Sequence, residues 1–246
     1  LGADVWVDFS DPTSYTTVGS TITAVTDKAS NFTITVGGTP TTGTTLNSLA
    51  TGTFDGNENL TSTGTGPYAD SGNHYAVGIF QWASTTSTRD SFWSADAGRT
   101  YAVSSSDASN GWPGEIDYDG SNQISFGKAK QDFTVSVSQN TWTIVSTSFN
   151  KTGNEIFGRI NGSQASAGDP YSTSMNSVAD FRLMRNRASV ELAGKAAEFF
   201  WVAGPTGTGG TDISNVEKAE GYIAWKWGLQ GNLPVSHPYK NAAPTT

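Results

Sequence analysis

The chain has 246 residues, no cysteine and a formal net charge of −8, with a sequence pI of about 4.6. This length suits one all-β domain with a full core, and the absence of cysteine excludes disulfides and thiolate metal sites. The acidic charge argues against nucleic acid as a partner, and no run of 18 apolar residues is present to insert into a membrane.

Alternation of apolar and polar residues predicts many short strands, the pattern of an antiparallel sandwich. The predicted strands cover residues 4–9, 21–25, 33–36, 74–81, 100–104, 123–126, 133–137, 142–149, 155–160 and 198–202. No linker or repeat interrupts this pattern. Residues 1–246 are therefore expected to form a single domain.

Turn residues separate the predicted strands. Asp55-Gly56, Asp119-Gly120 and Asn161-Gly162 are hairpin signals, because Asn, Asp and Gly tolerate positive φ. The Thr- and Gly-rich segments 39–48 and 204–210 are expected to be surface loops. Residues 1–8 lack the basic start and apolar run of a signal peptide. Because the chain begins with Leu, it is expected to be a processed or excised piece.

The last part of the chain carries the one helix that the sequence predicts. Ser214 and Glu217 have capping-box spacing, and Gly228 and Gly231 supply stop signals, so we expect a helix over about 214–229. One apolar face is formed by residues three to four apart: Val216, Ala219, Ile223 and Trp227. The polar residues are expected to point elsewhere: Lys218, Glu220, Lys226 and Gln230.

A tail over about 230–241 is expected to pack along one edge of the sandwich together with the helix. The residues expected to close the sandwich and anchor the tail are Ile223, Trp227, Leu229, Leu233, Pro238 and Tyr239. Trp6, Trp142 and Trp201 lie inside alternating strands and are expected in the core. His237, in the same tail, is interpreted as a hydrogen-bonded packing residue and not as a metal ligand.

Five segments occur together in a recognisable order: VWVDFSDPTSYTTVGSTITAVTDKAS at 5–30, FDGNENL at 54–60, RINGSQ at 159–164, FRLMRNRASVELAGKAAEFFWVAG at 181–204 and EGYIAWKWGLQGNLPVSHPYK at 220–240. They resemble a concanavalin A-like jelly roll of the laminin-G-like kind that is found in bacteriophage structural proteins. The resemblance implies an all-β, two-sheet antiparallel jelly-roll sandwich with a short C-terminal helix and tail. This fold hosts lectins, glycosidases, adhesion modules and inert virion parts.

The function that the resemblance implies first is a non-enzymatic virion surface domain, either a capsid decoration or a tail or fibre protein. Its partners would be other virion proteins and host-surface glycans, and its location the virion surface or the extracellular space. An alternative is a bacterial extracellular carbohydrate-binding or adhesion module. Self-association is left open, because no heptad or other oligomerisation signature is present.

The candidate sugar-binding residues are aromatic and acidic side chains in or beside polar loop sequence: Trp93, Trp112, Glu115, Asp117 and Tyr118. Aromatic rings stack on the apolar face of a pyranose, and carboxylates accept hydrogen bonds from its hydroxyl groups. The three indole and phenol rings in this set are therefore expected to be exposed.

A further alternative is a laminarinase-like glycoside hydrolase that uses Glu115, Asp117 and Asp119. Alternation along one strand would place these three carboxylates on one face, as a retaining mechanism requires. Two features weaken this hypothesis. Laminarinase-type glycosidases carry Glu at the third acidic position of this motif, where this chain has Asp119. In addition, Asp119-Gly120 is typical of a turn that would take Asp119 off the strand.

No cofactor is expected, with calcium as the alternative. Weak calcium ligands are Asp55, Asn57 and Glu58, or Asp107 with Asn110, because Ca²⁺ prefers oxygen ligands from neighbouring loops. None of these segments has the spacing of a self-contained calcium loop, and turn capping explains the same residues.

Overall fold

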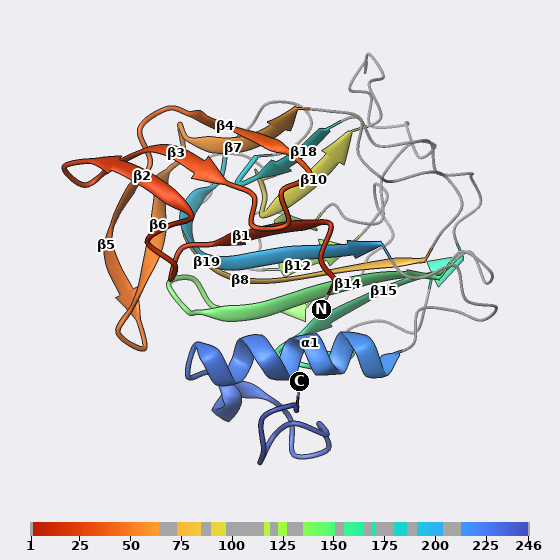
Figure 1. Ribbon diagram of the computed structural model, residues 1–246. Coiled ribbons are helices and arrows are strands. Elements are labelled where there is room, and N and C mark those ends of the chain that lie inside the picture. Colours follow the sequence, from red (N-terminus) through yellow and green to blue (C-terminus); the bar gives the residue numbers. More distant parts are fainter. Residues whose placement is uncertain are drawn as a thin grey trace.

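The computed structural model describes residues 2–63, 73–84, 90–96, 116–118, 123–126, 135–150, 155–164, 169–170, 180–185, 191–203 and 213–245. These parts form an antiparallel β-sandwich with one α-helix, α1 (Ile213–Lys226), and a short 3₁₀ helix, η1 (Gln230–Asn232) (Figure 1). The predicted jelly-roll sandwich class is confirmed. Among the described residues, no helix combines the length and the apolar character needed to cross a membrane.

The described strands are, in chain order, β1 (Val5–Asp8), β2 (Tyr15–Val18), β3 (Thr21–Thr26), β4 (Thr33–Gly37), β5 (Thr41–Leu46), β6 (Leu49–Asp55), β7 (Asn59–Thr63), β8 (His74–Ser84), β9 (Asp90–Ser91), β10 (Trp93–Asp96), β11 (Ile116–Tyr118), β12 (Gln123–Phe126), β13 (Val135–Ser136), β14 (Thr143–Asn150), β15 (Glu155–Ile160), β16 (Ser163–Gln164), β17 (Asp169–Pro170), β18 (Asp180–Leu183) and β19 (Ala193–Ala203). Hydrogen bonds join most of them in the order β10-β18-β7-β4-β3-β5-β6-β19-β8-β14-β15-β16. In addition, β1 pairs with β19, β2 with β3 and β17 with β15, while β9, β11, β12 and β13 form a small separate sheet.

The long sheet folds over itself into two layers. Strands β10, β18, β7, β4 and β3 make one layer, and β19, β8, β14 and β15 make the other, with β5 and β6 joining them on one side (Figure 1). Aromatic contacts cross between the layers: Phe181 of β18 stacks on Phe199 of β19 with ring centroids 4.9 Å apart, and Trp93 of β10 lies 5.2 Å from Phe199. The main hydrophobic core therefore lies between the layers.

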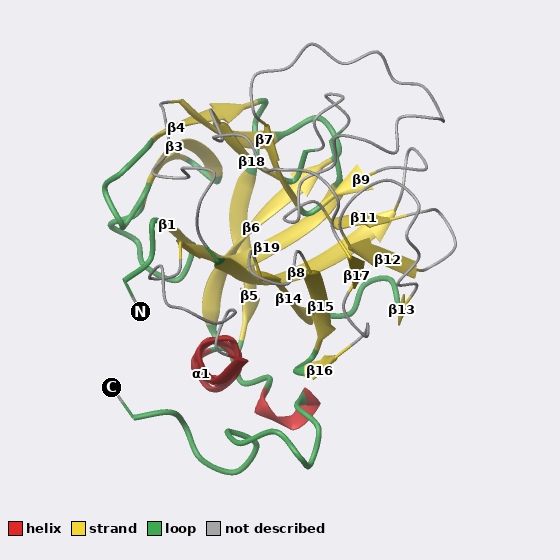
Figure 2. Ribbon diagram, turned by 90° about the vertical axis from the view of Figure 1, so that its right-hand side faces the viewer, coloured by secondary structure: helices red, strands yellow, loops and turns green. Residues whose placement is uncertain are grey.

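Alternation along β8 gives the second layer two apolar faces. Ala76 and Phe80 point into the main core, whereas Val77 and Ile79 point outward, and all four are buried. The outward residues need cover, and α1 supplies it. Figure 2, viewed along the helix axis, shows α1 beside this layer, on the side away from β4 and β7.

The predicted apolar face of α1 is confirmed, because its four members are fully buried: Val216, Ala219, Ile223 and Trp227. The expected position of the helix is wrong. Instead of lying across an edge of the sandwich, α1 packs on β8 and β14, which are interior strands of the sheet. It does so because the outer face of these strands is apolar.

Several predicted elements match the structure. The predicted strands 123–126 and 155–160 coincide with β12 and β15. Of the predicted strand 133–137, residues 135–137 are described, and β13 covers the first two of them. The hairpin at Asn161-Gly162 is confirmed, because it joins the paired strands β15 and β16 with positive φ angles. The hairpin predicted at Asp55-Gly56 is wrong: Gly56 has a positive φ and the chain turns there, but β6 and β7 on either side pair with other strands. The helix begins at Ile213, one residue before Ser214. The predicted strand 100–104, the turn Asp119-Gly120 and the predicted loop 204–210 lie outside the described residues.

The expected loop at 39–48 is wrong, since Thr41–Leu46 forms β5. This segment lacks alternating apolar residues, so nothing in the hydrophobic pattern marked it as a strand. Its partner β6 holds it through the backbone ladder and through threonine contacts, with Thr44 Oγ1 lying 2.6 Å from Thr51 Oγ1. β-branched residues and cross-strand Thr pairs favour this conformation.

The tail packs under the helix through fewer anchors than expected. Leu233 is buried, and Tyr239 lies so close to Gly221 that a Cβ there would come within 2.5 Å of the Tyr239 Cβ. Pro238 is exposed, so its predicted anchoring role is wrong. Of the tryptophans expected in the core, Trp201 is buried. Trp6 and Trp142 are half-buried and pack against the apolar cluster between α1 and the outer face of the second layer.

Replacing Trp227 by alanine tests how much the helix contributes to stability. Trp227 is fully buried, so Trp227→Ala should lower the free energy of unfolding by about 3–5 kcal/mol. The measurement is urea unfolding followed by circular dichroism. Val18→Ala, at a side chain that is 72% exposed, is the control and should change it by less than about 0.5 kcal/mol. An unchanged midpoint for Trp227→Ala would show that α1 does not belong to the cooperative core.

Candidate functional site

The predicted sugar-binding motif falls partly on described strands. Asp117 and Tyr118 lie on β11, which pairs with β9 through Asp117 and Ser91 and with β12 through Asp117 and Ser125. A strand at this point of the acidic motif is therefore present. Trp112, Glu115 and Asp119 lie outside the described residues, so the relative placement of the three candidate carboxylates stays a prediction.

The predicted exposure of Trp93 is wrong. Its side chain is fully buried in the main core, with ring centroids 5.8 Å from Phe80 and 5.2 Å from Phe199. Trp93 is on β10, and its ring faces the opposite layer of the sandwich. It therefore contributes to packing and offers no surface on which a sugar could stack.

The weak calcium candidates close a turn between β6 and β7. Asp55 Oδ1 accepts hydrogen bonds from the Asn57 backbone N–H and from Asn57 Nδ2, both at 3.1 Å, and Glu58 accepts one from the Asp55 N–H. Hydrogen bonding with Glu58 lowers the pKa of Asp55, and burial raises the pKa of Glu58. The described residues include no group of three or more His, Cys, Asp or Glu that could hold a metal ion. Asp107 and Asn110 lie outside them.

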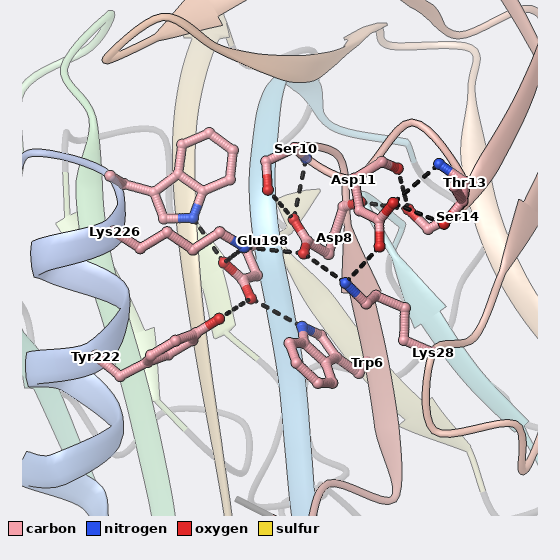
Figure 3. A network of polar contacts seen from close by, with 11 residues as sticks. Trp6, Asp8, Ser10, Asp11, Thr13, Ser14, Lys28, Glu198, Tyr222 and Lys226 are labelled. Atoms are coloured by element: carbon pink, nitrogen blue, oxygen red, sulfur yellow. Dashed lines mark hydrogen bonds and ion pairs between the residues drawn. The ribbon is translucent and has the colours of Figure 1, made fainter. Parts of the chain in front are cut away.

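A cluster of buried charges lies where β1, β19 and α1 meet (Figure 3). Its centre is Glu198 of β19, which is fully buried, and the residue opposite it in the ladder is Asp8 of β1, which is 3% exposed. Lys226 of α1 bridges the two carboxylates. Its Nζ lies 2.8 Å from Asp8 Oδ2 and 2.7 Å from Glu198 Oε2. We call Asp8, Glu198 and Lys226 the clasp.

A β-bulge sets the position of Glu198. The pairing of β19 with β8 shifts register between Ala196 and Glu198, and the carbonyl of the intervening Ala197 accepts a hydrogen bond from the Phe9 N–H at 3.1 Å. Beyond the bulge, the Glu198 carboxylate faces α1. Two indoles donate to it, Trp6 Nε1 at 2.8 Å and Trp227 Nε1 at 2.7 Å.

Asp8 is held equally firmly. Its Oδ1 accepts hydrogen bonds from the backbone N–H of Ser10 at 3.0 Å and from Ser10 Oγ at 2.6 Å. Its Oδ2 faces Lys226 and also Lys28 Nζ at 2.9 Å. Lys28 in turn pairs with Asp11 at 2.8 Å and lies over the Trp6 ring, 4.6 Å from its centroid.

The pKa values of the two carboxyl groups of the clasp are shifted in opposite directions. Burial raises the pKa of Glu198 above its ordinary value, although Lys226 pulls in the other direction. Burial would also raise the pKa of Asp8, but hydrogen bonds from Lys226, Ser10 and Lys28 outweigh it and hold the pKa of Asp8 below its ordinary value. Glu198 is thus the carboxyl that more readily carries a proton.

A second buried network connects α1 to β15 and to the tail. Glu220, predicted to point away from the apolar face, is instead fully buried, which corrects that expectation. Arg159 makes this burial tolerable, with its Nε 2.9 Å from Glu220 Oε1 and its Nη2 2.6 Å from the Gly162 carbonyl. His237 Nε2 lies 3.2 Å from Glu220 Oε2, which confirms His237 as a hydrogen-bonded packing residue.

Neither buried network is predicted from the sequence. One available signal was a glutamate inside the apolar run of β19, because a carboxylate is rarely buried without a partner. A second was Lys226 between Trp225 and Trp227 on the helix. Neither signal names the partners, because Asp8 and Lys226 are 218 positions apart and only the fold brings them together.

Comparisons with known proteins agree on the fold. No family model and no curated protein sequence matches the chain. Among solved structures, it is similar to domain 4 of AbnA, a GH43 extracellular arabinanase from Geobacillus stearothermophilus, in complex with arabinotriose. The TM-score is 0.59 with 14% identity, over 87% of this chain and 96% of that domain.

Two other solved structures are similar over a smaller share of their own length. For the botulinum neurotoxin type G receptor-binding domain the TM-score is 0.56 with 12% identity, over 89% of this chain and 50% of that one. For a Trypanosoma rangeli sialidase in complex with the inhibitor DANA the TM-score is 0.52 with 8% identity, over 82% of this chain and 31% of the enzyme. The chain thus spans about half of the first and a third of the second. At these identities the comparisons establish a shared jelly-roll-like fold.

Removing the buried charge of Glu220 should destabilise the protein, because it leaves the Arg159 charge buried without its main partner. We expect Glu220→Gln to lower the free energy of unfolding by about 3–5 kcal/mol at neutral pH, measured by urea unfolding. Glu217→Gln is the matched control. Glu217 lies 3.4 Å from the same guanidinium but is 26% exposed, so its loss should cost less than about 1 kcal/mol.

The difference in stability between the natural chain and Glu220→Gln should depend on pH. Burial opposes the charged form of Glu220, but hydrogen bonds from His237 and Arg159 outweigh it and keep the pKa of Glu220 below the ordinary 4.5. A lowered pKa stabilises the fold above the unfolded-state pKa, and this contribution is lost as the pH falls through the folded-state pKa. The advantage of the natural chain over Glu220→Gln should therefore shrink below about pH 4.5. An advantage that grows on acidification would contradict this assignment.

Proposed function

We propose that this chain is a non-catalytic carbohydrate-binding domain with a jelly-roll sandwich fold. The observation that carries the proposal is the similarity to domain 4 of the arabinanase, because it extends over 96% of a domain whose structure contains a bound trisaccharide. The likeness to the neurotoxin receptor-binding domain also supports a role in recognition.

The sugar would bind around β11. This strand carries Asp117 and Tyr118, and the sequence places Trp112 and Glu115 directly before it. An aromatic ring supplies a stacking surface and a carboxylate accepts hydrogen bonds from sugar hydroxyl groups, so this set has the chemistry that a glycan site needs. Trp93 is left out of the proposed site because it is buried in the core.

We further propose that the domain is presented on a virion surface, as a capsid decoration or a tail or fibre protein that contacts host-surface glycans. The five sequence segments that resemble bacteriophage laminin-G-like domains support this setting, and the acidic net charge of −8 is compatible with an exposed protein. A bacterial extracellular carbohydrate-binding module would use the same binding chemistry in a different setting.

A glycan array with the purified chain tests the binding proposal, followed by calorimetry on arabinotriose and on any glycan the array identifies. Truncating an aromatic anchor costs about 2 kcal/mol or more, so Trp112→Ala should weaken binding roughly thirtyfold. Trp225→Phe, at a half-buried position on α1, is the control and should bind like the natural chain. A blank array together with no binding of arabinotriose would contradict the proposal.

Product analysis on the bound glycan and on β-glucans separates binding from catalysis. The proposal predicts that no reducing ends are released. Release by the natural chain and its loss in Glu115→Gln would instead establish a glycoside hydrolase with Glu115, Asp117 and Asp119 as the acidic residues to examine.

A further inference from the structure

The clasp brings an amine and a carboxyl group into direct contact inside the protein. Lys226 Nζ lies 2.8 Å from Asp8 Oδ2, and the same nitrogen lies 2.7 Å from Glu198 Oε2. Asp8 is 3% exposed, Glu198 is fully buried, and the rings of Trp6 and Tyr222 lie beside Glu198 (Figure 3). The Trp227 indole also donates a hydrogen bond to Glu198. Lys226 is half-buried and touches two buried acids, of which one can react and the other can carry a proton. These are the groups that an intramolecular condensation needs.

We propose that Lys226 and Asp8 form an intramolecular isopeptide bond, with Glu198 as the catalytic residue. The Lys226 Nζ–Asp8 Cγ bond forms, the Asp8 Cγ–Oδ2 bond breaks, and the oxygen leaves as water. An ammonium and a carboxylate thus become a neutral amide and one water molecule. Charge and atoms balance without any oxidant, reductant or cofactor.

The reaction moves two protons from Lys226 Nζ to the departing Asp8 Oδ2, and Glu198 is placed to move them. Its carboxylate contacts the ammonium of Lys226, so it can take each proton in turn from nitrogen and return it to Oδ2. It lies directly opposite Asp8 in the β1–β19 ladder, and the bulge at Ala197 aims it at the helix. Burial raises the pKa of Glu198, which suits a group that holds a proton between the two transfers.

Asp8 is held as a carboxylate, and attack at its Cγ requires that the negative charge on its oxygens be compensated by hydrogen-bond donors. When the amine adds, negative charge develops on Oδ1, and this oxygen already accepts hydrogen bonds from the Ser10 N–H and Oγ. Two fixed donors at the position where charge develops form an oxyanion hole.

Lys226, and not Lys28, is the nucleophile, since an amine must lose its charge to attack. Lys28 pairs with both Asp11 and Asp8, and these hydrogen bonds outweigh burial and raise the pKa of Lys28. Lys226 is the lysine in contact with the proton-carrying Glu198. Converting the buried Asp8 and the half-buried Lys226 into an amide also removes the unfavourable desolvation of the Asp8 charge.

Mass spectrometry of the intact, denatured chain tests the proposal. The natural protein, purified in its folded state, should be lighter by one water than its sequence requires. A tryptic digest should contain one branched peptide that joins the Asp8 segment to the Lys226 segment, with no cleavage after Lys226. A mass equal to that of the sequence would overturn the proposal. So would a lost water that maps to a cyclised Asp55-Gly56 or Asp119-Gly120.

Variants assign the roles. Lys226→Arg and Glu198→Gln should show the full mass, and circular dichroism on each establishes that it is folded. Asp8→Asn should lose ammonia in place of water, because the amide nitrogen is then the leaving group. Lys28→Arg is the matched control and should retain the branched peptide. Loss of the cross-link in Lys28→Arg, with its retention in Lys226→Arg, would overturn the choice of nucleophile. Its retention in folded Glu198→Gln would overturn the role of Glu198.

Discussion

A fully buried carboxylate on the outer face of the second layer, that of Glu198, constrains much of what lies around it. A charge-bearing group without exposure must be hydrogen-bonded and paired, or it destabilises the fold. The Trp6 indole of β1 donates to this carboxylate from one side. Lys226 of α1 and Trp227, directly after the helix, contact it from the other. Strand β1 and helix α1 therefore hold their positions on β19 through the same acid, and the apolar cluster under the helix is closed only when both are in place.

The buried polar networks stabilise the fold, whereas the proposed glycan site lies on other strands. Asp8, Glu198, Glu220 and Arg159 are all almost completely buried and have partners within the protein, so they stabilise the arrangement of β1, α1 and the tail. The sugar-binding hypothesis rests on β11 and the sequence before it, which belong to the small sheet of β9, β11, β12 and β13. Because β1, α1 and the tail stabilise the sandwich, the connections between other strands can vary in sequence without loss of the fold. Binding domains that share a fold differ in such connections.

The sequence was sufficient for the fold class, for about half of the described strands and for the apolar face of α1, because period-2 and period-3.6 patterns follow directly from backbone geometry. It was insufficient where long-range pairing decides the outcome. Strand β5 has no apolar alternation and depends on β6, and Glu220 is buried only because Arg159 lies opposite it. Trp93 illustrates the same limit, since loop-like neighbours suggested exposure while β10 turns its ring into the core. The clasp joins positions 218 apart, a distance that local patterns do not span.

The central claim is that buried charges make both ends of the chain part of one cooperative unit. Native-state hydrogen exchange of the backbone amides tests it most directly, by comparing α1 and β1 with the interior strands β8 and β19. We expect the last two turns of α1 and the paired amides of β1 to open with the same free energy as β8 and β19, by global unfolding only. Exchange of α1 through a separate opening of much lower free energy, with β8 and β19 still protected, would contradict it.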